Sequence, residues 1–292
     1  MGAGQSNATT NILKVCDDKN VIRSSLSAEF EDKPFDEGTF RYCYEGIIKQ
    51  GKRQAYPNDF PSGRCVVKVF KDHNRSDSWL NETDNSLFSR KMANLFNSNK
   101  FSEGLHKIYF VSPYIAHLDE YAGFKLFGLF NIRNDDAKEK IKKNKVLMIE
   151  PFLTGNYIKF VSNTNWTNPE IESKTIPAFM HFTWVISKGT AIVSDVQGVI
   201  KDGCFLLTDP AVQSVNKSYG ASDLGVFGLI QFLAKHEHNE YCNFLPWPNL
   251  QIMNILKATY QRTFRGTSFS FQFNICQNGR DAYLKICDSI FN

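Results

Sequence analysis

The stretch AIVSDVQGVIKDGCFLLTDP, residues 191–210, decides the fold and carries the most informative chemistry of the chain. A short apolar run ends at Val193, so Asp195 stands where a strand gives way to a turn. Asp209 follows two leucines at another expected strand end. A carboxylate at such a place is held rigidly and still reaches solvent. The two carboxylates and the amide of Gln197 could therefore hold a hard cation such as Mg²⁺ through oxygen ligands.

Lys68 lies within a second strand pattern, Arg64–Phe70, which follows a Pro-Ser-Gly turn. An unpaired ammonium group is costly to bury, so Lys68 should meet a phosphate or a carboxylate. A lysine, two acids and an amide supply what phosphoryl transfer requires: charge neutralisation, metal binding and a base for the attacking hydroxyl group. Each of these residues alone is more often a turn residue or a snorkelling lysine. Taken together, they favour a catalytic set.

A cluster of metal-binding residue types, His236-x-His238-x₃-Cys242, closes a predicted helix. Two imidazoles and a thiolate within two turns would need one more ligand to complete a tetrahedral zinc site. His181 is the best candidate, because it stands among aromatic residues in another predicted helix. A lone histidine on such an apolar face is more often a hydrogen-bonded core residue.

The composition indicates a globular protein with a sizeable core, since 42% of the 292 residues are hydrophobic and 14% are aromatic. Thirty-four basic and 30 acidic residues give a net charge of +4, too weak a bias to indicate a nucleic-acid partner. Seven scattered cysteines without paired spacing favour a reduced, cytoplasmic protein. The longest uncharged run, 241–256, contains two prolines and is too short to span a bilayer, so we expect no transmembrane helix.

The first six residues, Met-Gly-Ala-Gly-Gln-Ser, fit the pattern for N-myristoylation of Gly2. One acyl chain without a polybasic cluster binds membranes only weakly, so peripheral association would be weak. Residues 1–30 are polar with little periodicity, and we expect them to form a mobile arm.

The remaining sequence changes character near its middle. Strands are expected in the first half, together with a helix at Ser78–Asn97 and a charged, solvated loop at Asn134–Lys145. The expected strands of this half are Phe40–Ile48, Arg64–Phe70, Lys107–Val111, Gly123–Phe130 and Val146–Glu150.

Helices are expected to dominate the second half, around a strand at Ala191–Val193 and another that ends before Asp209. The expected helices are Pro169–Ser187, Asp223–His236 and Leu250–Arg265. We therefore predict an α+β protein of two lobes with a cleft: a strand-rich N-lobe at 31–152 and a mixed C-lobe at 153–248. Residues 249–292 would form a helical and aromatic extension.

Five stretches, in order along the chain, carry a family resemblance. They are Pro34-Phe35-x-x-Gly38-x-Phe40-Arg41; Val66-Val67-Lys68; Glu150-Pro151-Phe152 with Gly155 and Lys159-Phe160; His181-Phe182-Thr183-Trp184 with Asp195-Val196-Gln197-Gly198 and Leu207-Thr208-Asp209-Pro210; and Tyr219-Gly220-Ala221-Ser222-Asp223-Leu224-Gly225 running to His236. The set resembles the atypical alpha-kinases, the family of myosin heavy chain kinases, elongation factor 2 kinase and channel-kinases.

The resemblance implies an ATP site. Lys68 would bind the phosphates, with Arg41 near them, and Glu150 and Phe152 would lie at the hinge beside the adenine. The loop Gly220-Ala221-x₃-Gly225 resembles the glycine-rich loop near the nucleotide and the peptide. The acidic partner of Lys68 in the first helix would be Glu82 or Asp84.

The resemblance also implies the chemistry. Asp195 would be the catalytic aspartate, Gln197 and Asp209 would hold Mg²⁺, and a structural zinc would bind His181, His236, His238 and Cys242. The chain departs from the family at His238, which stands where the family usually has cysteine, and at Trp166, where glycine is common.

The activity implied is that of a serine/threonine protein kinase that prefers threonine and acts on protein substrates with ATP and Mg²⁺. A scaffold that binds ATP without catalysis is a second possibility, although no phosphate lysine or metal acid is missing. A zinc hydrolase is a third, but four protein ligands would close the zinc and leave no position for water.

Overall fold

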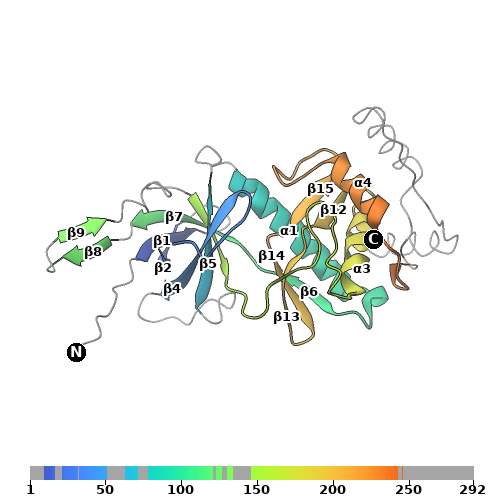
Figure 1. Ribbon diagram of the computed structural model, residues 1–292, viewed down its shortest axis with the longest axis horizontal. Coiled ribbons are helices and arrows are strands. Elements are labelled where there is room, and N and C mark those ends of the chain that lie inside the picture. The colour runs from blue at the N-terminus through green and yellow to red at the C-terminus, as the bar shows by residue number, and fades with distance from the viewer. Residues whose placement is uncertain are drawn as a thin grey trace. The chain divides into compact units, whose positions relative to one another are not determined.

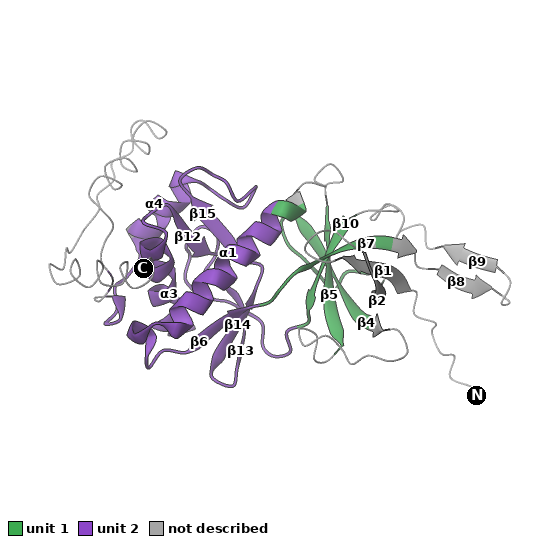
Figure 2. Ribbon diagram, turned by 180° about the vertical axis from the view of Figure 1, so that it is seen from behind, with its two compact units in different colours: residues 1–80, 111–152 green, residues 81–110, 153–292 purple. Residues whose placement is uncertain are grey.

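The computed structural model describes residues 10–16, 22–31, 33–50, 63–71, 78–120, 123–126, 130–133, 146–242 and 245 (Figure 1). The chain forms two compact units, coloured separately in Figure 2. Unit 1 comprises Met1–Leu80 and Val111–Phe152, and unit 2 comprises Asn81–Phe110 and Leu153–Asn292. Residues 81–110 thus belong with unit 2, whereas the sequence placed them in the strand-rich lobe.

Unit 1 is an antiparallel sheet that closes on itself. The strand order is β2-β1-β7-β10-β5-β4-β3, and β2 pairs with β4 as well as with β1. Closure satisfies backbone groups that an open edge would expose. A separate hairpin joins β8 (Gly123–Leu126) to β9 (Phe130–Arg133). The strands of the closed sheet are β1 (Thr10–Cys16), β2 (Ile22–Glu31), β3 (Asp36–Glu37), β4 (Arg41–Gln50), β5 (Arg64–Phe70), β7 (Tyr114–Glu120) and β10 (Val146–Pro151).

One face of this sheet forms the core of unit 1, because alternate residues of a strand share a face. Val67 and Val69 of β5 are fully buried in this core, as are Leu147 and Ile149 of β10. The same cluster contains Ala28, Phe30, Tyr44, Ile48, Cys65, Ala116 and Leu118. Lys68, which lies between the two valines, therefore belongs to the opposite face.

The prediction of a mobile arm over residues 1–30 is wrong for the described part of that segment, which contains β1 and most of β2. The pattern of Leu26, Ala28 and Phe30 already has the period of a strand, but serines between them obscure it. Ala28 and Phe30 are buried in the core, so the hydrophobic energy of these positions holds β2 in the sheet.

Unit 2 packs helices around two small sheets. A four-stranded sheet has the order β11-β13-β14-β6, with β14 parallel to β6, and β12 pairs with β15. Its strands are β6 (Lys107–Phe110), β11 (Ile158–Lys159), β12 (Ala191–Ser194), β13 (Gln197–Lys201), β14 (Cys204–Thr208) and β15 (Ala211–Ser214). Its helices are α1 (Ser78–Ser98, in unit 2 from Asn81), the 3₁₀ helix η1 (Lys100–Ser102), α3 (Thr175–Ile186) and α4 (Val226–Lys235).

The centre of unit 2 is α3, which is buried along almost its whole length. Such an all-round apolar helix lies inside a core. Trp184 is fully buried and meets Phe232 of α4 edge-on, with ring centroids 6.1 Å apart. Phe96 of α1 meets Phe179 and Phe182 in the same way, at 5.4 and 5.5 Å. Aromatic packing therefore ties all three helices together.

Most of the expected elements are confirmed, with shifted ends. The helix predicted to begin at Pro169 begins at Thr175. Asn168 accepts a hydrogen bond from the Glu170 N–H in a turn before it, and the Ser173 hydroxyl accepts one from the Ile176 N–H at the helix start. The strand predicted at Gly123–Phe130 is in fact parts of the two strands β8 and β9.

Several expectations fall outside the described residues. These are myristoylated Gly2, the charged loop Asn134–Lys145, the helix Leu250–Arg265 and the extension 249–292. Among the helices that are described, none combines the length and the apolar character that a membrane span requires.

Gly198 in β13 provides a test of the fold. Its φ is +153°, and an added Cβ would contact the carbonyl oxygen of Leu206 and lie 2.8 Å from Cα of Leu207. We expect Gly198→Ala to lower the free energy of unfolding by about 3 kcal/mol, through backbone strain and steric overlap. Denaturant titration measures this loss.

Gly38→Ala is the matched control, because a Cβ at Gly38 would have no atom within 4 Å. Equal unfolding free energies for the two variants would contradict the tight pairing of β13 with β14.

Candidate active site

The two aspartates of the opening stretch lie at adjacent corners of unit 2. The chain passes from β12 to β13 through Asp195, and from β14 to β15 through Asp209. Ser194 pairs with Ala211 in the β12–β15 ladder, and Gln197 pairs with Thr208 in the β13–β14 ladder. Both corners therefore lie between these two ladders. The sequence prediction that both carboxylates end strands is confirmed, and the pairing brings them together.

Both corner aspartates have a left-handed backbone, with φ of +52° at Asp195 and +55° at Asp209. Aspartate tolerates this region better than most residues, whereas a β-branched residue would be strained there. The turn geometry thus selects the residue type that the chemistry also needs.

Lys159 of β11 is a site residue to which sequence reasoning gave no role. Its Nζ lies 2.8 Å from Oδ1 of Asp195, and the side chains are 44% and 20% exposed. Lys159 is brought there because it pairs with Gln197 on β13, close to the corner. The Lys159-Phe160 dipeptide was the available signal, but its partner depends on strand register.

Gln197 links the two corners. Its Nε2 donates to the backbone carbonyl of Asp209 at 3.3 Å, and its side chain is buried. The amide oxygen of Gln197 then remains as an acceptor or a ligand. One carboxylate oxygen of Asp209 is shielded from solvent. These oxygen donors fit Mg²⁺, which prefers hard ligands and retains waters.

A buried polar network lies behind the corners and was invisible in the sequence. Asn163 Oδ1 accepts from Nε2 of Gln213 and from the Ser194 hydroxyl group. Oε1 of Gln213 accepts from the N–H of Leu224 at 2.5 Å. The Asn163 amide donates to the Ser222 carbonyl at 2.9 Å. Gln213 is fully buried, so these bonds offset its desolvation and attach the glycine-rich loop to β15.

Asp223 fixes the shape of the glycine-rich loop. Its fully buried carboxylate accepts from the N–H and the hydroxyl group of Ser214, at 2.9 and 2.6 Å. It also accepts from the N–H groups of Tyr219, at 3.1 Å, and Gly225, at 2.8 Å. These local bonds compete with a helix, which explains why α4 begins at Val226 rather than at Asp223.

The glycines of this loop are required by its geometry. Gly220 has φ of +82°, and an added Cβ would lie 2.7 Å from Cβ of Asn81 on α1. Gly225 has φ of +68° at the start of α4. Ala221, predicted to bind the nucleotide, is exposed between them.

In unit 1, Lys68 forms a buried ion pair with Glu150. The two charged atoms, Nζ and Oε2, are 2.7 Å apart, and the side chains are only 6% and 3% exposed. The family resemblance implied that the acidic partner of Lys68 would lie on the first helix and that Glu150 would lie beside the adenine. The register explains the contact, because Met148 pairs with Lys68 and Glu150 stands two residues further along β10 on the same face.

Arg41 and Phe152 complete the predicted set of unit 1. Arg41 pairs with Phe70, two residues from Lys68, and therefore shares its face of the sheet. Phe152 follows β10, where the guanidinium carbon of Arg64 lies 3.8 Å from its ring centroid. Its N–H donates to the Arg64 carbonyl at 3.2 Å, so cation–π contact and backbone pairing fix this ring.

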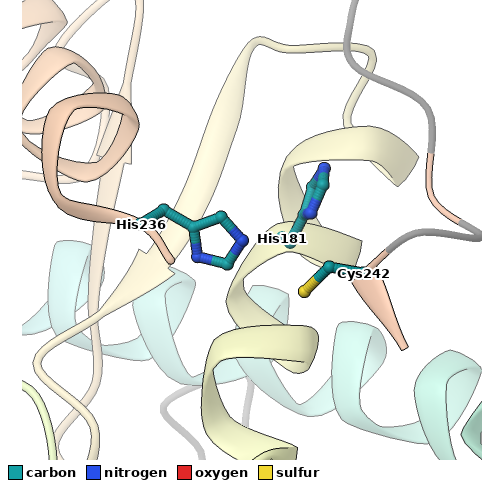
Figure 3. A group of neighbouring side chains, drawn as sticks. All are labelled: His181, His236 and Cys242. Atoms are coloured by element: carbon teal, nitrogen blue, oxygen red, sulfur yellow. The ribbon is translucent and has the colours of Figure 1, made fainter. Parts of the chain in front are cut away.

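Three of the four predicted zinc ligands form one group, and the fourth, His238, lies next to it. His181 comes from α3, His236 from the end of α4, and Cys242 from the segment beyond (Figure 3). One ligand atom from each lies within 4.8 Å of the others. The His238 ring is 5.0 Å from that of His181 and 5.1 Å from that of His236, measured between centroids. His181, His236 and Cys242 therefore form one group of possible ligands, and the His238 ring lies beside its two imidazoles.

The electrostatics of this cluster suit a metal ion. Burial, followed by the neighbouring His238, lowers the pKa of His236 to about 3. Burial also lowers the pKa of His238 and raises that of the Cys242 thiol to about 11. The imidazoles of His236 and His238 are therefore neutral at neutral pH, the form that binds metal, and a cation would favour the thiolate of Cys242. Imidazole nitrogen and thiolate sulfur are donors that suit Zn²⁺.

Comparison with known sequences gives the following matches. The model of the Alpha-kinase family matches residues 36–242. Alpha-protein kinase vwkA of Dictyostelium discoideum is 27% identical over 224 residues, which cover 76% of this chain and 31% of that protein. Eukaryotic elongation factor 2 kinase of Caenorhabditis elegans is 32% identical over 221 residues, covering 75% and 24%. This chain thus spans less than a third of these relatives.

Solved structures agree with the fold. The alpha-kinase domain of myosin heavy chain kinase A, a Dictyostelium discoideum protein solved with ADP, matches with a TM-score of 0.57 at 22% identity, covering 82% of this chain and 97% of that domain. An alpha-kinase from Entamoeba histolytica gives 0.56 at 23% identity, covering 83% and 91%. The predicted α+β, kinase-like fold is confirmed.

The buried pair of Lys68 and Glu150 predicts a strong coupling. Glu150→Leu alone should cost about 3–5 kcal/mol of unfolding free energy, because it leaves a buried ammonium group unpaired. The double variant Lys68→Met/Glu150→Leu should recover most of that loss. Denaturant titration of the wild type, the single variants Lys68→Met and Glu150→Leu, and the double variant gives the coupling energy.

Glu45→Gln is the control, because Glu45 pairs with Arg64 at 2.6 Å with both side chains well exposed. It should cost at most about 1 kcal/mol. Additive costs for Lys68 and Glu150 would refute the coupling.

Proposed function

The chain belongs to the alpha-kinase family, and we propose that it is a protein kinase that transfers the γ-phosphoryl group of ATP to serine or threonine side chains of protein substrates. Threonine is the expected acceptor, as the family resemblance implies. The observation that carries the proposal is the pair of adjacent corners, where Asp195, Gln197 and Asp209 present oxygen donors beside the ammonium group of Lys159.

In this proposal Asp195 orients the substrate hydroxyl group and accepts its proton. Lys159 at 2.8 Å holds the Asp195 carboxylate in one orientation, so no reorganisation is needed at the moment of transfer. Gln197 and Asp209 hold Mg²⁺, which supplies neutralisation of the phosphate charge when it is bound. Catalysis is then mainly positioning and electrostatic stabilisation.

Lys68 binds the phosphates of ATP in this proposal, and Glu150 keeps it in place. The ammonium group carries three donors, so the contact with Glu150 at 2.7 Å leaves others for an anion. Arg41 on the same face adds positive charge, and the ring of Phe152 offers an apolar surface that suits the adenine.

The scaffold reading is less well supported. It would be favoured by the loss of a phosphate-binding lysine or of a metal acid, and Lys68, Asp195 and Asp209 are all present. The buried networks around Asn163 and Asp223 also hold the site in one shape, as a catalytic site requires.

We also propose that Zn²⁺ binds His181, His236, His238 and Cys242 and has a structural role. Supporting this, the cluster joins α3 to the end of α4 and the segment beyond, and four protein ligands leave no position for a reacting water. His238 takes the place of the usual cysteine, and imidazole is an equally ordinary zinc ligand.

The activity has a direct test. Asp195→Asn keeps the shape of the side chain and tolerates the left-handed turn, but removes the charge. We expect transfer of labelled phosphoryl from Mg²⁺-ATP to a basic protein to fall by at least about 100-fold, because the base is lost.

Asp202→Asn is the matched control, since Asp202 also has a left-handed backbone, with φ of +50°, and is an exposed turn residue of the same unit. Equal rates for Asp195→Asn and wild type would contradict the assignment. Absent transfer by every protein, with ATP binding retained, would favour the scaffold.

The zinc proposal predicts one zinc ion per chain by elemental analysis of the purified protein. His238→Ala should lower the zinc content and the unfolding temperature, because a ligand is lost, whereas His238→Cys should retain both. His106→Ala, at an exposed histidine of the same unit, is the control. If a chelator left the unfolding temperature of the wild type unchanged, a structural zinc would be excluded.

A further inference from the structure

Unit 2 contains a cavity of about 550 Å³ that the proposed reaction does not use. That volume lies within the range of natural ligand sites, roughly 300–1,000 Å³. The walls come from α1, from the start of β12, and from the end of β15 with the loop after it. The residues that matter for its chemistry are Asp84, Phe88, Thr190, Ser214, Asn216 and Tyr219.

The cavity lies at the far end of the β12–β15 pair from the corner aspartates. Ala191 and Ser214, which both line it, pair with each other, whereas the corners begin beyond the pair of Ser194 and Ala211. Three residue steps along a strand separate these pairs by roughly 10 Å. A ligand in the cavity would therefore not occupy the proposed catalytic site.

The lining indicates a cationic ligand. The rings of Phe88 and Tyr219 lie with centroids 5.5 Å apart at 60°, so both aromatic residues contribute to the same cavity. Aromatic faces attract ammonium and guanidinium groups, and Asp84 adds a full negative charge. Within the part of the chain that the structure describes, no lysine or arginine forms an ion pair with Asp84.

Two carboxylates act on the phenol of Tyr219, which lines the cavity. Burial, followed by the charges of Asp84 and Asp223, raises the pKa of the Tyr219 phenol. Both carboxylates are therefore near enough to Tyr219 to act on its phenol, and Asp84 itself lines the cavity.

The cavity is built before a ligand arrives. Asn85 of α1 donates to the Tyr219 carbonyl at 3.0 Å, and the N–H of Tyr219 donates to the buried Asp223. Gly220 packs against Asn81 with no room for a Cβ. A preformed wall spares the ligand the entropy cost of ordering it.

We propose that this cavity binds the side chain of an arginine or lysine presented by a segment of a partner protein. The aromatic rings receive the cationic group, and Asp84 pairs with it. Asn216 and Ser218 are exposed polar residues at the same cavity, where they can hydrogen-bond to a peptide main chain. A free amine would use the rings and the charge but not these groups, so a protein segment is the fuller match.

The site is joined to the glycine-rich loop through Tyr219. Because Asp223 binds both Tyr219 and Gly225, a ligand that holds the Tyr219 ring also restricts the loop. Partner binding and the state of that loop are therefore energetically coupled, and the coupling acts in both directions.

Binding is tested with two peptide libraries and the full chain. One library has a fixed central arginine and random flanks, and the other has citrulline, which is neutral and has the same shape. Fluorescence anisotropy should show the arginine library bound at least about tenfold more tightly by the wild type. Asp84→Asn should reduce this preference to less than about twofold, as should Tyr219→Leu.

Glu103→Gln is the matched control, because Glu103 is an exposed acid of unit 2 outside the cavity, and it should keep the wild-type preference. A preference that survives Asp84→Asn would overturn the proposal, as would equal binding of both libraries by the wild type. Free agmatine competing as strongly as the arginine library would assign the cavity to small amines and overturn the protein source. None of these measurements requires phosphoryl transfer, so they stand apart from the proposed activity.

Discussion

The crossing of two strand pairs at Asp195 and Asp209 is the constraint on which the rest of unit 2 depends. Each chain segment leaves one small sheet and enters the other at a left-handed aspartate, and the same ladders hold both corners. This arrangement fixes the backbone before any side chain is considered. Lys159 and Gln197 then reach the corners because β11 pairs with β13.

In unit 1 the main constraint is the buried ammonium group of Lys68, which needs a partner inside the sheet. Lys68 and Glu150 are nearly inaccessible to solvent, so their pairing is specific but not a net source of stability. The hydrophobic core on the other face, with Val67, Val69 and Ile149, supplies the stability instead. Because alternate residues of β5 point to opposite faces, Lys68 lies on one face of the sheet and the apolar core on the other.

Local patterns in the sequence predicted much of this. Strand β5 has the predicted bounds, because β-branched and aromatic residues fill it, and α1 differs by one residue at its end. The group of His181, His236 and Cys242 was predicted from spacing within one segment, together with one histidine that stood out in an apolar helix. Asp195 and Asp209 were found because each ends an apolar run.

Contacts that depend on register could not be predicted. The partner of Lys68 was sought on the wrong element, since nothing in the sequence says that Glu150 stands beside it. Asn163 and Gln213 look like ordinary polar residues until folding buries them together. Strand β2 was missed because serines interrupt its apolar alternation, although Ala28 and Phe30 are core residues.

That missed strand has a consequence for how the molecule can be divided. The family match begins at residue 36, whereas β1 and β2 precede it and pair with β7 and β4. A fragment cut to the family boundary would open the sheet, leave β4 and β7 with unpaired edges and uncover the apolar surface that Phe30 now fills. In such a fragment, the exposed strand edges of one copy would pair with those of another, and the fragment would aggregate. The residues that match the family model thus leave out two strands of the closed sheet of unit 1.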